Sequence, residues 1–454
     1  MCVFGIEFVY TSEAWVCVWG CLGVNLHTIA SLVCVCKFVH THCARVCVVR
    51  MTVINSINTA YRWMDQKVAL RAAAAVDRGE ALESEIYRQC LEKSNGREIF
   101  VGRVISETGE DLKDAKLPIN THSLLLEGCS GRSSGRTVRL FVSECIEYFV
   151  YAGQILGAIG RFGSSSEFHA ETLVRSPDGQ ATHIHTGASL LLLVASGPYS
   201  PDSMLLFDSI SELEVKVRQN PLDVLILMGP FLDITNPIIA SGTVCDAFKR
   251  PVSFEDIYRE EIFPKISRLA RACETVKTRL VLVPSVNEAR FDFPLPQPSF
   301  AVTSAPVWTT FVKELPSCVE FVSNPATITM GETCVLISST DALSALNSNV
   351  LFKQSTVENS LGRVDECFAE FLRSKTLFPV SPCNLRIDPA NASLLQITQS
   401  PSLVVFPAAG RRFVKSVHGC TFVNPGQMSD PSGTVSTVAS IVIDAKIEAE
   451  ILKI

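Results

Sequence analysis

Short apolar runs separated by polar, turn-forming residues dominate the chain between residues 98 and 175. Gly, Ser, Asn and Asp lie between the runs and indicate turns, so each run is predicted to form a strand. The runs are EIFVGRVI (98–105), SLLLEGC (123–129), RTVRLFVS (136–143), QILGAIGRF (154–162) and HAETLVR (169–175). Five strands within about 80 residues are typical of a small closed barrel of the OB type. We therefore predict an OB-fold domain over residues 97–187.

After Ser189 the apolar runs become longer. SLLLLVASGP (189–198), DVLILMGP (223–230) and RLVLVPS (279–285) are nearly continuous, as expected of strands that are buried on both faces. Later runs are expected to complete the same large sheet, and they are CVLISS (334–339), SLVVFP (402–407), RFVKSV (412–417) and TVSTVASIVI (434–443). The Pro-rich segment FPLPQPSF (293–300) is unsuited to the interior of a strand or helix and is predicted to be a surface loop.

Helix signals lie between these strands. Ser209 and Glu212 have the spacing of a capping box at the start of a helix, and so do Ser253 and Asp256. A further helix is expected at about residues 363–374 from its periodic apolar pattern. Because the first of these helices connects two buried strands, it predicts a βαβ unit with a parallel strand pair. The fold class is therefore α/β, or α+β when the barrel is included.

Residues 51–96 precede the barrel and have the composition of a helical linker. Charged residues alternate there with Ala, Leu, Ile and Val, which favours helix. Gly79 interrupts the pattern, so two short helices are expected in place of one long helix.

The first fifty residues differ from the rest of the chain. They hold seven of the 17 cysteines, and Ala14–Cys36 is an uncharged stretch of 23 residues. That length is enough to cross a bilayer, but the upstream flank carries Glu7 and Glu13 where a secretory signal needs positive charge. A zinc site would have to use Cys34, Cys36, His40, His42, Cys43 and Cys47. These residues lack the C-x₂-C pairs that typically chelate zinc. We favour a third hypothesis, in which residues 1–50 are an atypical Cys-rich extension from a gene model that begins too early, and Met51 is the natural start.

The charge balance argues against a protein that holds nucleic acid chiefly through a basic surface. The chain has 40 Lys and Arg against 46 Asp and Glu, which gives 40 − 46 = −6. Residues 97–187 alone contain 9 basic and 11 acidic side chains. Phosphate binding requires clustered positive charge, so a structural or protein-binding barrel is favoured over a nucleic-acid reader.

Candidate chemistry is sparse. In open α/β sheets, ligands bind beyond the carboxyl ends of the strands, and the tips here are rich in Gly, Pro and Ser. No phosphate-binding P-loop motif is present. Ser196 lacks a G-x-S-x-G elbow, and His418 is the only histidine after His185 that could serve as its base. We therefore predict no catalytic residue, no bound metal and no cofactor.

A repeated pattern of strand followed by a tight turn resembles the calcineurin-like metallophosphoesterases, whose metals are held by D-x-H, G-D-x-x-D, G-N-H and G-H-x-H motifs. The matching tips read SGP (196–198), GPFLD (229–233), VPS (283–285) and HGC (418–420). The resemblance implies that the former metal-site positions are Ser196, Pro198, Pro230, Asp233, Ser285 and His418. One clear carboxylate cannot hold a binuclear centre, so an inactivated phosphoesterase domain is expected over residues 188–454.

A second resemblance covers about residues 58–443. The chain resembles the B subunits of DNA polymerase α, which are non-catalytic members of the polymerase α–primase complex. The resemblance rests on AYRWM (60–64), RSSGRTVRLFVSE (132–144), VASGPYS (194–200), DVLILMGPFLD (223–233), FEDIY (254–258), LPQPSF (295–300) and RRFVKSVHGCTFVNPG (411–426).

This resemblance implies an OB barrel packed on an inactivated phosphoesterase domain. Together they would bind the zinc-binding C-terminal region of the polymerase catalytic subunit and link it to primase, so that RNA primers are extended with DNA. It also implies a nuclear location, no membrane association, and at most indirect or weak contact with DNA. An active metal-dependent phosphoesterase remains the enzymatic alternative, and a membrane-anchored protein the third. The residues that contact the partner are not identified by the sequence.

Overall fold

The computed structural model describes residues 7–11, 14–18, 51–54, 82–106, 119–128, 135–164, 166–179, 181, 189–220, 222–245, 249–302, 306–355, 360–381, 384–433 and 435–454. The chain divides into two compact units, Met1–Arg50 and Met51–Ile454. In the first unit, β1 (Glu7–Thr11) pairs antiparallel with β2 (Ala14–Val18). The predicted membrane stretch beyond Val18, the candidate zinc ligands and most of the predicted helical linker lie outside the described residues. Within the ranges described, no helix is both long enough and apolar enough to span a bilayer.

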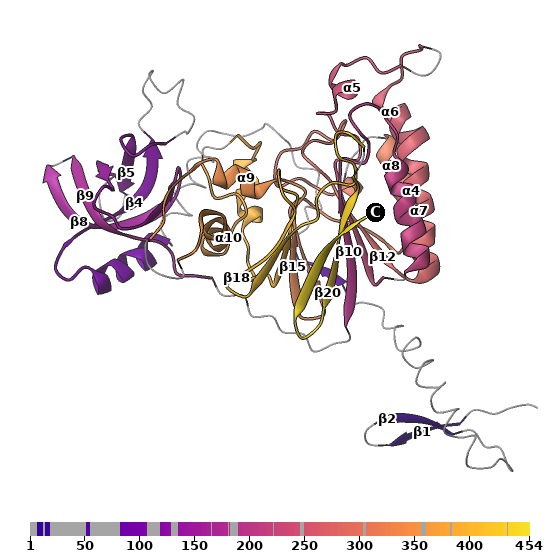
Figure 1. The fold of residues 1–454 in the computed structure, drawn as a ribbon, viewed down its shortest axis with the longest axis horizontal. Helices are drawn as coiled ribbons and strands as arrows, with labels where there is room; N and C mark the ends of the chain where they lie inside the picture. The colour runs from indigo at the N-terminus through magenta and orange to yellow at the C-terminus, as the bar shows by residue number, and fades with distance from the viewer. Residues whose placement is uncertain are drawn as a thin grey trace, which may run out of the picture. The chain divides into compact units, whose positions relative to one another are not determined.

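The five predicted barrel strands form a closed barrel, which confirms this part of the sequence prediction (Figure 1). The strands are β4 (Glu98–Ser106), β5 (Leu124–Gly128), β6 (Thr137–Phe141), β8 (Ile155–Ser164) and β9 (Glu167–Val174), in the order β4-β5-β6-β9-β8. A parallel pairing of β6 with β9 completes the ring, and the other pairings are antiparallel. Alternate residues point inward and bury a core that includes Val104, Leu126, Leu140 and Phe168.

A helix over residues 82–93 packs on the outside of the barrel. Its residues Ile86 and Cys90 are buried against side chains of β4, β8 and β9. Gly157 makes this close approach possible, because a Cβ at that position would lie 2.3 Å from the Cys90 sulfur.

The first sheet of the α/β domain has six strands in the order β13-β12-β11-β10-β20-β21. They are β10 (Leu190–Ser196), β11 (Val224–Met228), β12 (Arg279–Val283), β13 (Val319–Phe321), β20 (Thr437–Ile443) and β21 (Ile447–Lys453). Strands β10 to β13 are parallel, whereas β20 and β21 extend the sheet antiparallel. The predicted βαβ unit and its parallel strand pair are confirmed.

A second six-stranded sheet has the order β18-β19-β17-β15-β14-β3. Its strands are β3 (Met51–Val53), β14 (Ala326–Met330), β15 (Thr333–Ile337), β17 (Leu403–Val405), β18 (Phe413–Val417) and β19 (Cys420–Asn424). The prediction of one large sheet was therefore wrong. An apolar run shows that a strand is buried, but it does not specify which strand will pair with it.

Helices α4 (Asp208–Gln219), α7 (Phe263–Val276) and α8 (Pro306–Glu314) lie together beside the first sheet (Figure 1). The capping box of Ser253 and Asp256 is confirmed at the start of α6 (Phe254–Ile257), which continues through a π-helical turn into α7. The capping box predicted at Ser209 was wrong. Phe207 is the N-cap of α4, and the Ser209 hydroxyl instead donates to the Tyr199 carbonyl at 2.8 Å.

The barrel and the α/β domain are joined by a shared ribbon. Strand β7 (Tyr148–Tyr151), which follows β6, pairs antiparallel with β16 (Val350–Lys353) of the α/β domain. Phe149 and Tyr151 belong to the same buried cluster as α10 (Arg363–Arg373). The α/β fold class with an OB-type barrel is thus confirmed.

The Pro-rich segment 293–300 is buried, so the prediction of a surface loop was wrong. Leu295 and Gln297 are fully buried. The segment satisfies its backbone through neighbouring loops, because Leu295 N–H donates to the Arg386 carbonyl at 2.8 Å and Gln297 N–H to the Asn324 carbonyl at 2.7 Å. Prolines without N–H groups lower the number of backbone donors that need such partners, which suits this segment to an interior position.

Candidate functional site

The carboxyl ends of β10, β11 and β12 meet at one edge of the first sheet, as expected of parallel neighbours. Backbone packs on backbone there. Gly197 N–H donates to the Met228 carbonyl at 2.8 Å, and Gly229 N–H donates to the Val283 carbonyl at 2.9 Å. A Cβ on Gly197 would lie 2.1 Å from the Pro230 carbonyl oxygen. The predicted positions Pro198 and Pro230 follow these glycines through cis peptide bonds and supply no ligand atom.

Ser196 ends β10 and is completely buried. Its hydroxyl has only a weak contact, 3.4 Å from the Gly197 carbonyl oxygen. The segment after β19 lies over this tip, because Met428 N–H donates to the Ser196 carbonyl at 2.8 Å and Ser429 N–H to the Pro198 carbonyl at 3.0 Å. Ser196 therefore faces the covering segment and does not face the open cleft that a nucleophile would need.

Asp233 lies in the loop after β11 and is half-buried. Its Oδ1 accepts hydrogen bonds from the backbone N–H and the hydroxyl of Thr235, both at 2.8 Å. Burial raises the pKa of Asp233, and the two bonds from Thr235 partly offset that effect. The carboxylate thus orders its own turn, and in the described part of the chain no group of three or more His, Cys, Asp or Glu is placed to hold a metal ion.

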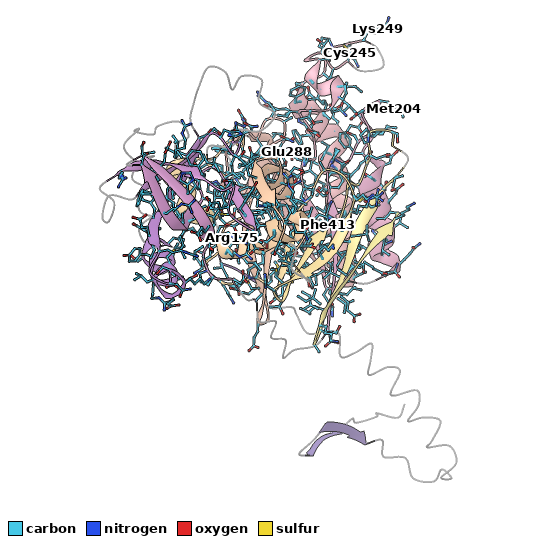
Figure 2. All side chains as sticks on the ribbon, turned by 60° about the vertical axis from the view of Figure 1, so that its left-hand side comes forward. Arg175, Met204, Cys245, Lys249, Glu288 and Phe413 are labelled. Atoms are coloured by element: carbon cyan, nitrogen blue, oxygen red, sulfur yellow. The ribbon has the colours of Figure 1, made fainter. Side chains whose placement is uncertain are left out.

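Glu288 is a buried carboxyl group at these tips that the sequence prediction missed. It is 2% exposed and lies inside the α/β domain (Figure 2). The backbone N–H of Phe231 lies 3.1 and 2.9 Å from its two carboxyl oxygens, and the N–H of Leu232 lies 2.9 Å from Oε1. The Tyr258 hydroxyl lies 2.6 Å from the same oxygen. Glu288 follows Ser285 by only three residues, so its position just after a strand tip was the available signal.

Burial raises the pKa of Glu288 to about 7, although Tyr258 and the two N–H groups favour the ionised form. The Tyr258 hydroxyl is also 2.7 Å from the Ala289 carbonyl oxygen. A single hydroxyl proton serves one acceptor at a time. Tyr258 therefore donates to ionised Glu288, whereas protonated Glu288 can donate to Tyr258 while Tyr258 donates to Ala289. The Glu288 carboxyl group therefore keeps a hydrogen-bond partner in both protonation states without movement of heavy atoms.

Neutral amides and hydroxyls close the rest of the crevice at the strand tips, which is where open α/β sheets bind ligands. Asn324 Oδ1 accepts from the Ser338 hydroxyl at 2.9 Å and from the Ser339 N–H at 3.1 Å, so it holds the tip of β15. The Ser339 hydroxyl donates to the Pro284 carbonyl at 2.6 Å. Gln297 donates to the carbonyl of Ser285, the predicted position after β12, at 2.8 Å. These bonds join the tips of the two sheets, and all of the side chains involved are buried.

His418 is not brought together with the other predicted positions. It lies in the turn between β18 and β19, before β19 begins, whereas the strand tips follow β15, β17 and β19. Because these three strands are parallel, their tips lie at the opposite edge of the second sheet from His418. Its Nε2 lies 3.9 Å from Asp178 Oδ2, at the junction with the barrel.

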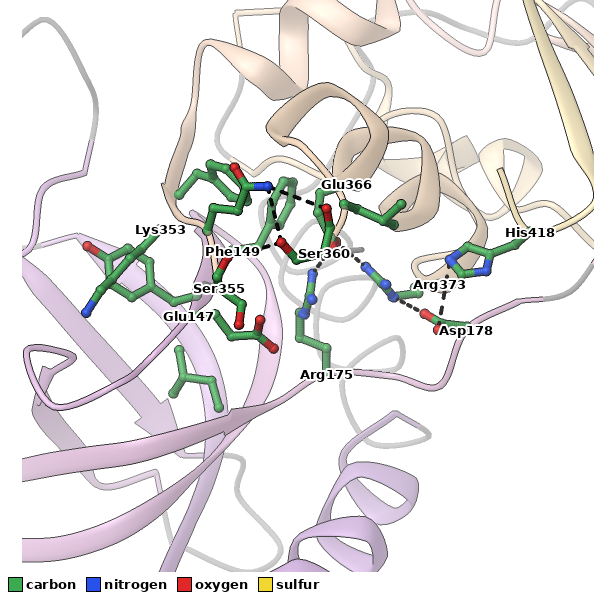
Figure 3. A pocket seen from close by; sticks show the side chains of 15 residues that line it. Glu147, Phe149, Arg175, Asp178, Lys353, Ser355, Ser360, Glu366, Arg373 and His418 are labelled. Atoms are coloured by element: carbon green, nitrogen blue, oxygen red, sulfur yellow. Dashed lines mark hydrogen bonds and ion pairs between the residues drawn. The ribbon is translucent and has the colours of Figure 1, made fainter. Parts of the chain in front are cut away.

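A pocket of about 350 Å³ lies at this junction (Figure 3). An ion network forms one wall, in which Arg175 donates to Glu366 at 2.9 Å and Arg373 to Glu366 at 2.8 Å. Arg373 also pairs with Asp178. Burial by itself would raise the pKa of Glu366, but the two arginines outweigh burial and hold that pKa below its usual value. Because these charged side chains pair with one another across the junction, the network links the barrel to the α/β domain.

Glu370 completes the network from the adjoining turn of α10. It is 3% exposed and accepts a hydrogen bond from the Tyr151 hydroxyl of β7 at 2.8 Å. Arg175 and Arg373 lie 3.8 and 3.7 Å from its other oxygen. Burial raises the pKa of Glu370 despite both arginines. This hydrogen bond and these ion pairs link the barrel to the α/β domain.

Comparison with solved structures gives matches of low similarity, and one of them is an archaeal phosphodiesterase, at a TM-score of 0.27 and 9% sequence identity over 58% of this chain and 100% of that one. The protein TT1561 of Thermus thermophilus has a TM-score of 0.27 and 12% identity over 58% of this chain and 99% of that one.

Sequence comparison gives a more specific result. Residues 192–415 match the model of the DNA polymerase alpha/epsilon B subunit, and residues 65–176 match the OB domain of the DNA polymerase alpha B subunit. The relative from Schizosaccharomyces pombe is 26% identical over 72% of this chain and 57% of its own length. The mouse relative is 27% identical over 70% of this chain and 51% of its own length. Both are named as the B subunit of DNA polymerase alpha, and the chain spans little more than half of either. The chain belongs to the family of DNA polymerase alpha B subunits.

Proposed function

We propose that the chain is a non-catalytic accessory subunit of DNA polymerase alpha–primase. In this role it binds the zinc-binding C-terminal region of the polymerase catalytic subunit in the nucleus and supports the synthesis of RNA–DNA primers. The observation that carries the proposal is the closed crevice at the strand tips, where Glu288 and a neutral hydrogen-bond network occupy the place in which an α/β enzyme binds its substrate. Family membership names the complex in which such a domain would serve.

The enzymatic alternative is an active metal-dependent phosphoesterase. Of the predicted former metal-site positions, Asp233 is the one carboxylate, and it is engaged by Thr235. A metal that activates water for hydrolysis needs several converging nitrogen or oxygen ligands and an open coordination position. The residues at these tips supply neither, so we propose no metal and no cofactor.

A binding role needs a surface of fixed shape. The β7–β16 ribbon and the buried ion network hold the barrel and the α/β domain together. Next to this junction, Ile146 is 68% exposed beside Glu147 of the pocket, and Val364 is 41% exposed at the start of α10. Exposed apolar side chains near a rigid junction are suitable anchors for a protein partner.

Co-purification tests the proposal directly. The full chain, mixed with the C-terminal region of a polymerase alpha catalytic subunit, is expected to elute as one complex. Ile146→Asp and Val364→Asp should each weaken the complex by about tenfold or more, because a charge would be buried in the interface. Val215→Asp on α4, where Val215 is 53% exposed, is the matched surface control and should bind normally. No complex with the unaltered chain would reject the proposed partner.

Catalysis is tested separately. Phosphodiesterase turnover is measured with added Mn²⁺ for the unaltered chain and for Asp233→Ala. We expect no turnover by either protein. Turnover that is lost in Asp233→Ala would establish the enzymatic alternative and contradict a non-catalytic role.

A further inference from the structure

The loop after β11 presents several hydrogen-bond donors to one point. The N–H groups of Phe231 and Leu232 and the hydroxyl of Tyr258 all lie within 3.1 Å of the Glu288 carboxyl group. Phe231 is 1% exposed, and Leu232 and Tyr258 are fully buried. Converging backbone N–H groups form a concave site that suits an anion.

The space in this loop is shaped for a carboxyl group. A Cβ on Gly229 would lie 2.7 Å from Glu288 Oε2, so the glycine leaves room for that oxygen. The charge of Asp233 also raises the pKa of Glu288, but Asp233 directs its own Oδ1 to Thr235. One carboxyl group, that of Glu288, therefore lies against all of these donors.

We propose that residues 229–232 and Tyr258 form a carboxylate-binding site, and that the chain fills this site with its own Glu288. The ligand class is a small aliphatic monocarboxylate. Glu288 acts as a tethered ligand that links the tip of β12 to the tip of β11 and seals the crevice against free anions. This inference does not depend on the identity of the partner protein.

Matched truncation and replacement test the site. Glu288→Ala removes the carboxyl group and Cγ, and acetate supplies those atoms. Glu288→Gly also removes Cβ, and propionate supplies the three carbons lost. Each truncated chain should be stabilised by its own carboxylate, because a ligand that binds only the folded state raises the unfolding midpoint. We expect an increase of about 2 °C or more in the full-length chain at about 100 mM ligand, measured against chloride at equal ionic strength.

Selectivity separates a built site from general salt effects. Acetate should stabilise Glu288→Ala more than propionate does, because propionate has one methylene too many for the space. The unaltered chain and Glu288→Gln should respond to neither ligand, since their own side chains fill the site. Leu227→Ala, which removes a fully buried side chain from β11, is the control for a cavity without converging donors.

Each outcome is decisive. A size-matched gain in stability, or recovery of soluble Glu288→Ala in acetate but not in chloride, supports the proposal. Equal responses of Glu288→Ala and Leu227→Ala would overturn it. Insolubility of both truncated chains even in their matched carboxylates would also count against it, because a refilled site should restore folding.

Discussion

Two buried glutamates of the α/β domain have similar surroundings but different partners. Glu288 at the strand tips and Glu370 at the barrel junction each accept a hydrogen bond from a tyrosine hydroxyl, at 2.6 and 2.8 Å. The other partners of Glu288 are uncharged N–H groups, whereas those of Glu370 are Arg175 and Arg373. Burial raises the pKa of both side chains.

The difference separates two ways of keeping a carboxyl group inside a protein. Backbone donors leave Glu288 free to gain a proton near neutral pH, so the site tolerates both charge states. Arginines place full positive charge in the interior. Removal of one partner then leaves an unpaired buried charge, which lowers the stability of the fold. The strand tips should therefore respond to pH, whereas the junction should respond to the removal of an ion partner.

The largest effect is expected at the junction. Arg373→Ala would leave the half-buried Glu366 and the buried Glu370 with one arginine between them, and Arg373 itself is 7% exposed. Breaking a buried ion network costs about 3–5 kcal/mol, so the free energy of unfolding should fall by that amount. Urea denaturation of the full chain measures the loss. A decrease under about 1 kcal/mol would show that the network does not brace the junction.

The second effect is the pH dependence of the strand tips. The pKa of Glu288 is about 7 in the folded chain and 4.5 in its reference state, so folding favours proton uptake. The stabilising contribution is fully present below about pH 4.5 and is lost as pH rises through about 7. Relative to Glu288→Gln, the unaltered chain should lose at most about 3 kcal/mol across this window.

Urea unfolding of both chains at several pH values within this window tests the pH prediction. Glu288→Gln is the suitable reference because its amide keeps the shape of the side chain but does not titrate in this range. A constant difference between the two chains would contradict the raised pKa.

A smaller effect separates the two tyrosines. Tyr258→Phe should cost about 2 kcal/mol at a pH above 7, because it removes a donor from a carboxylate whose other partners are neutral. Tyr151→Phe should cost about 1 kcal/mol, because two arginines still face Glu370. Thermal or urea unfolding of the pair gives the comparison. Equal losses would show that the arginines do not compensate for the missing hydroxyl.

The smallest effect is expected on the barrel surface. Arg161 is 56% exposed and pairs with Glu144 at 2.6 Å. Solvent screens such pairs, so Arg161→Ala should leave the unfolding midpoint unchanged within error. A clear decrease would mean that exposed pairs stabilise this barrel as much as the buried network stabilises the junction.

Much of the fold could be predicted from local patterns. The five barrel strands and the three central strands of the first sheet have periodic or continuous apolar residues, which report burial directly. Strands such as β7 and β14 were missed because they are short or alternate apolar residues with Thr. The division into two sheets was also missed, since pairing depends on residues far apart in sequence.

The sequence by itself determined which side chains stand at the predicted strand tips, where Ser, Pro and Gly carry few groups that bind metal ions. Only the tertiary structure decided what fills the space. Glu288 meets the backbone of Phe231 from 57 residues away, and Tyr151 meets Glu370 across 219 residues. Nearly all residues carry a backbone N–H donor, so the residue types in a sequence do not show where such donors converge. The fold alone determines that position.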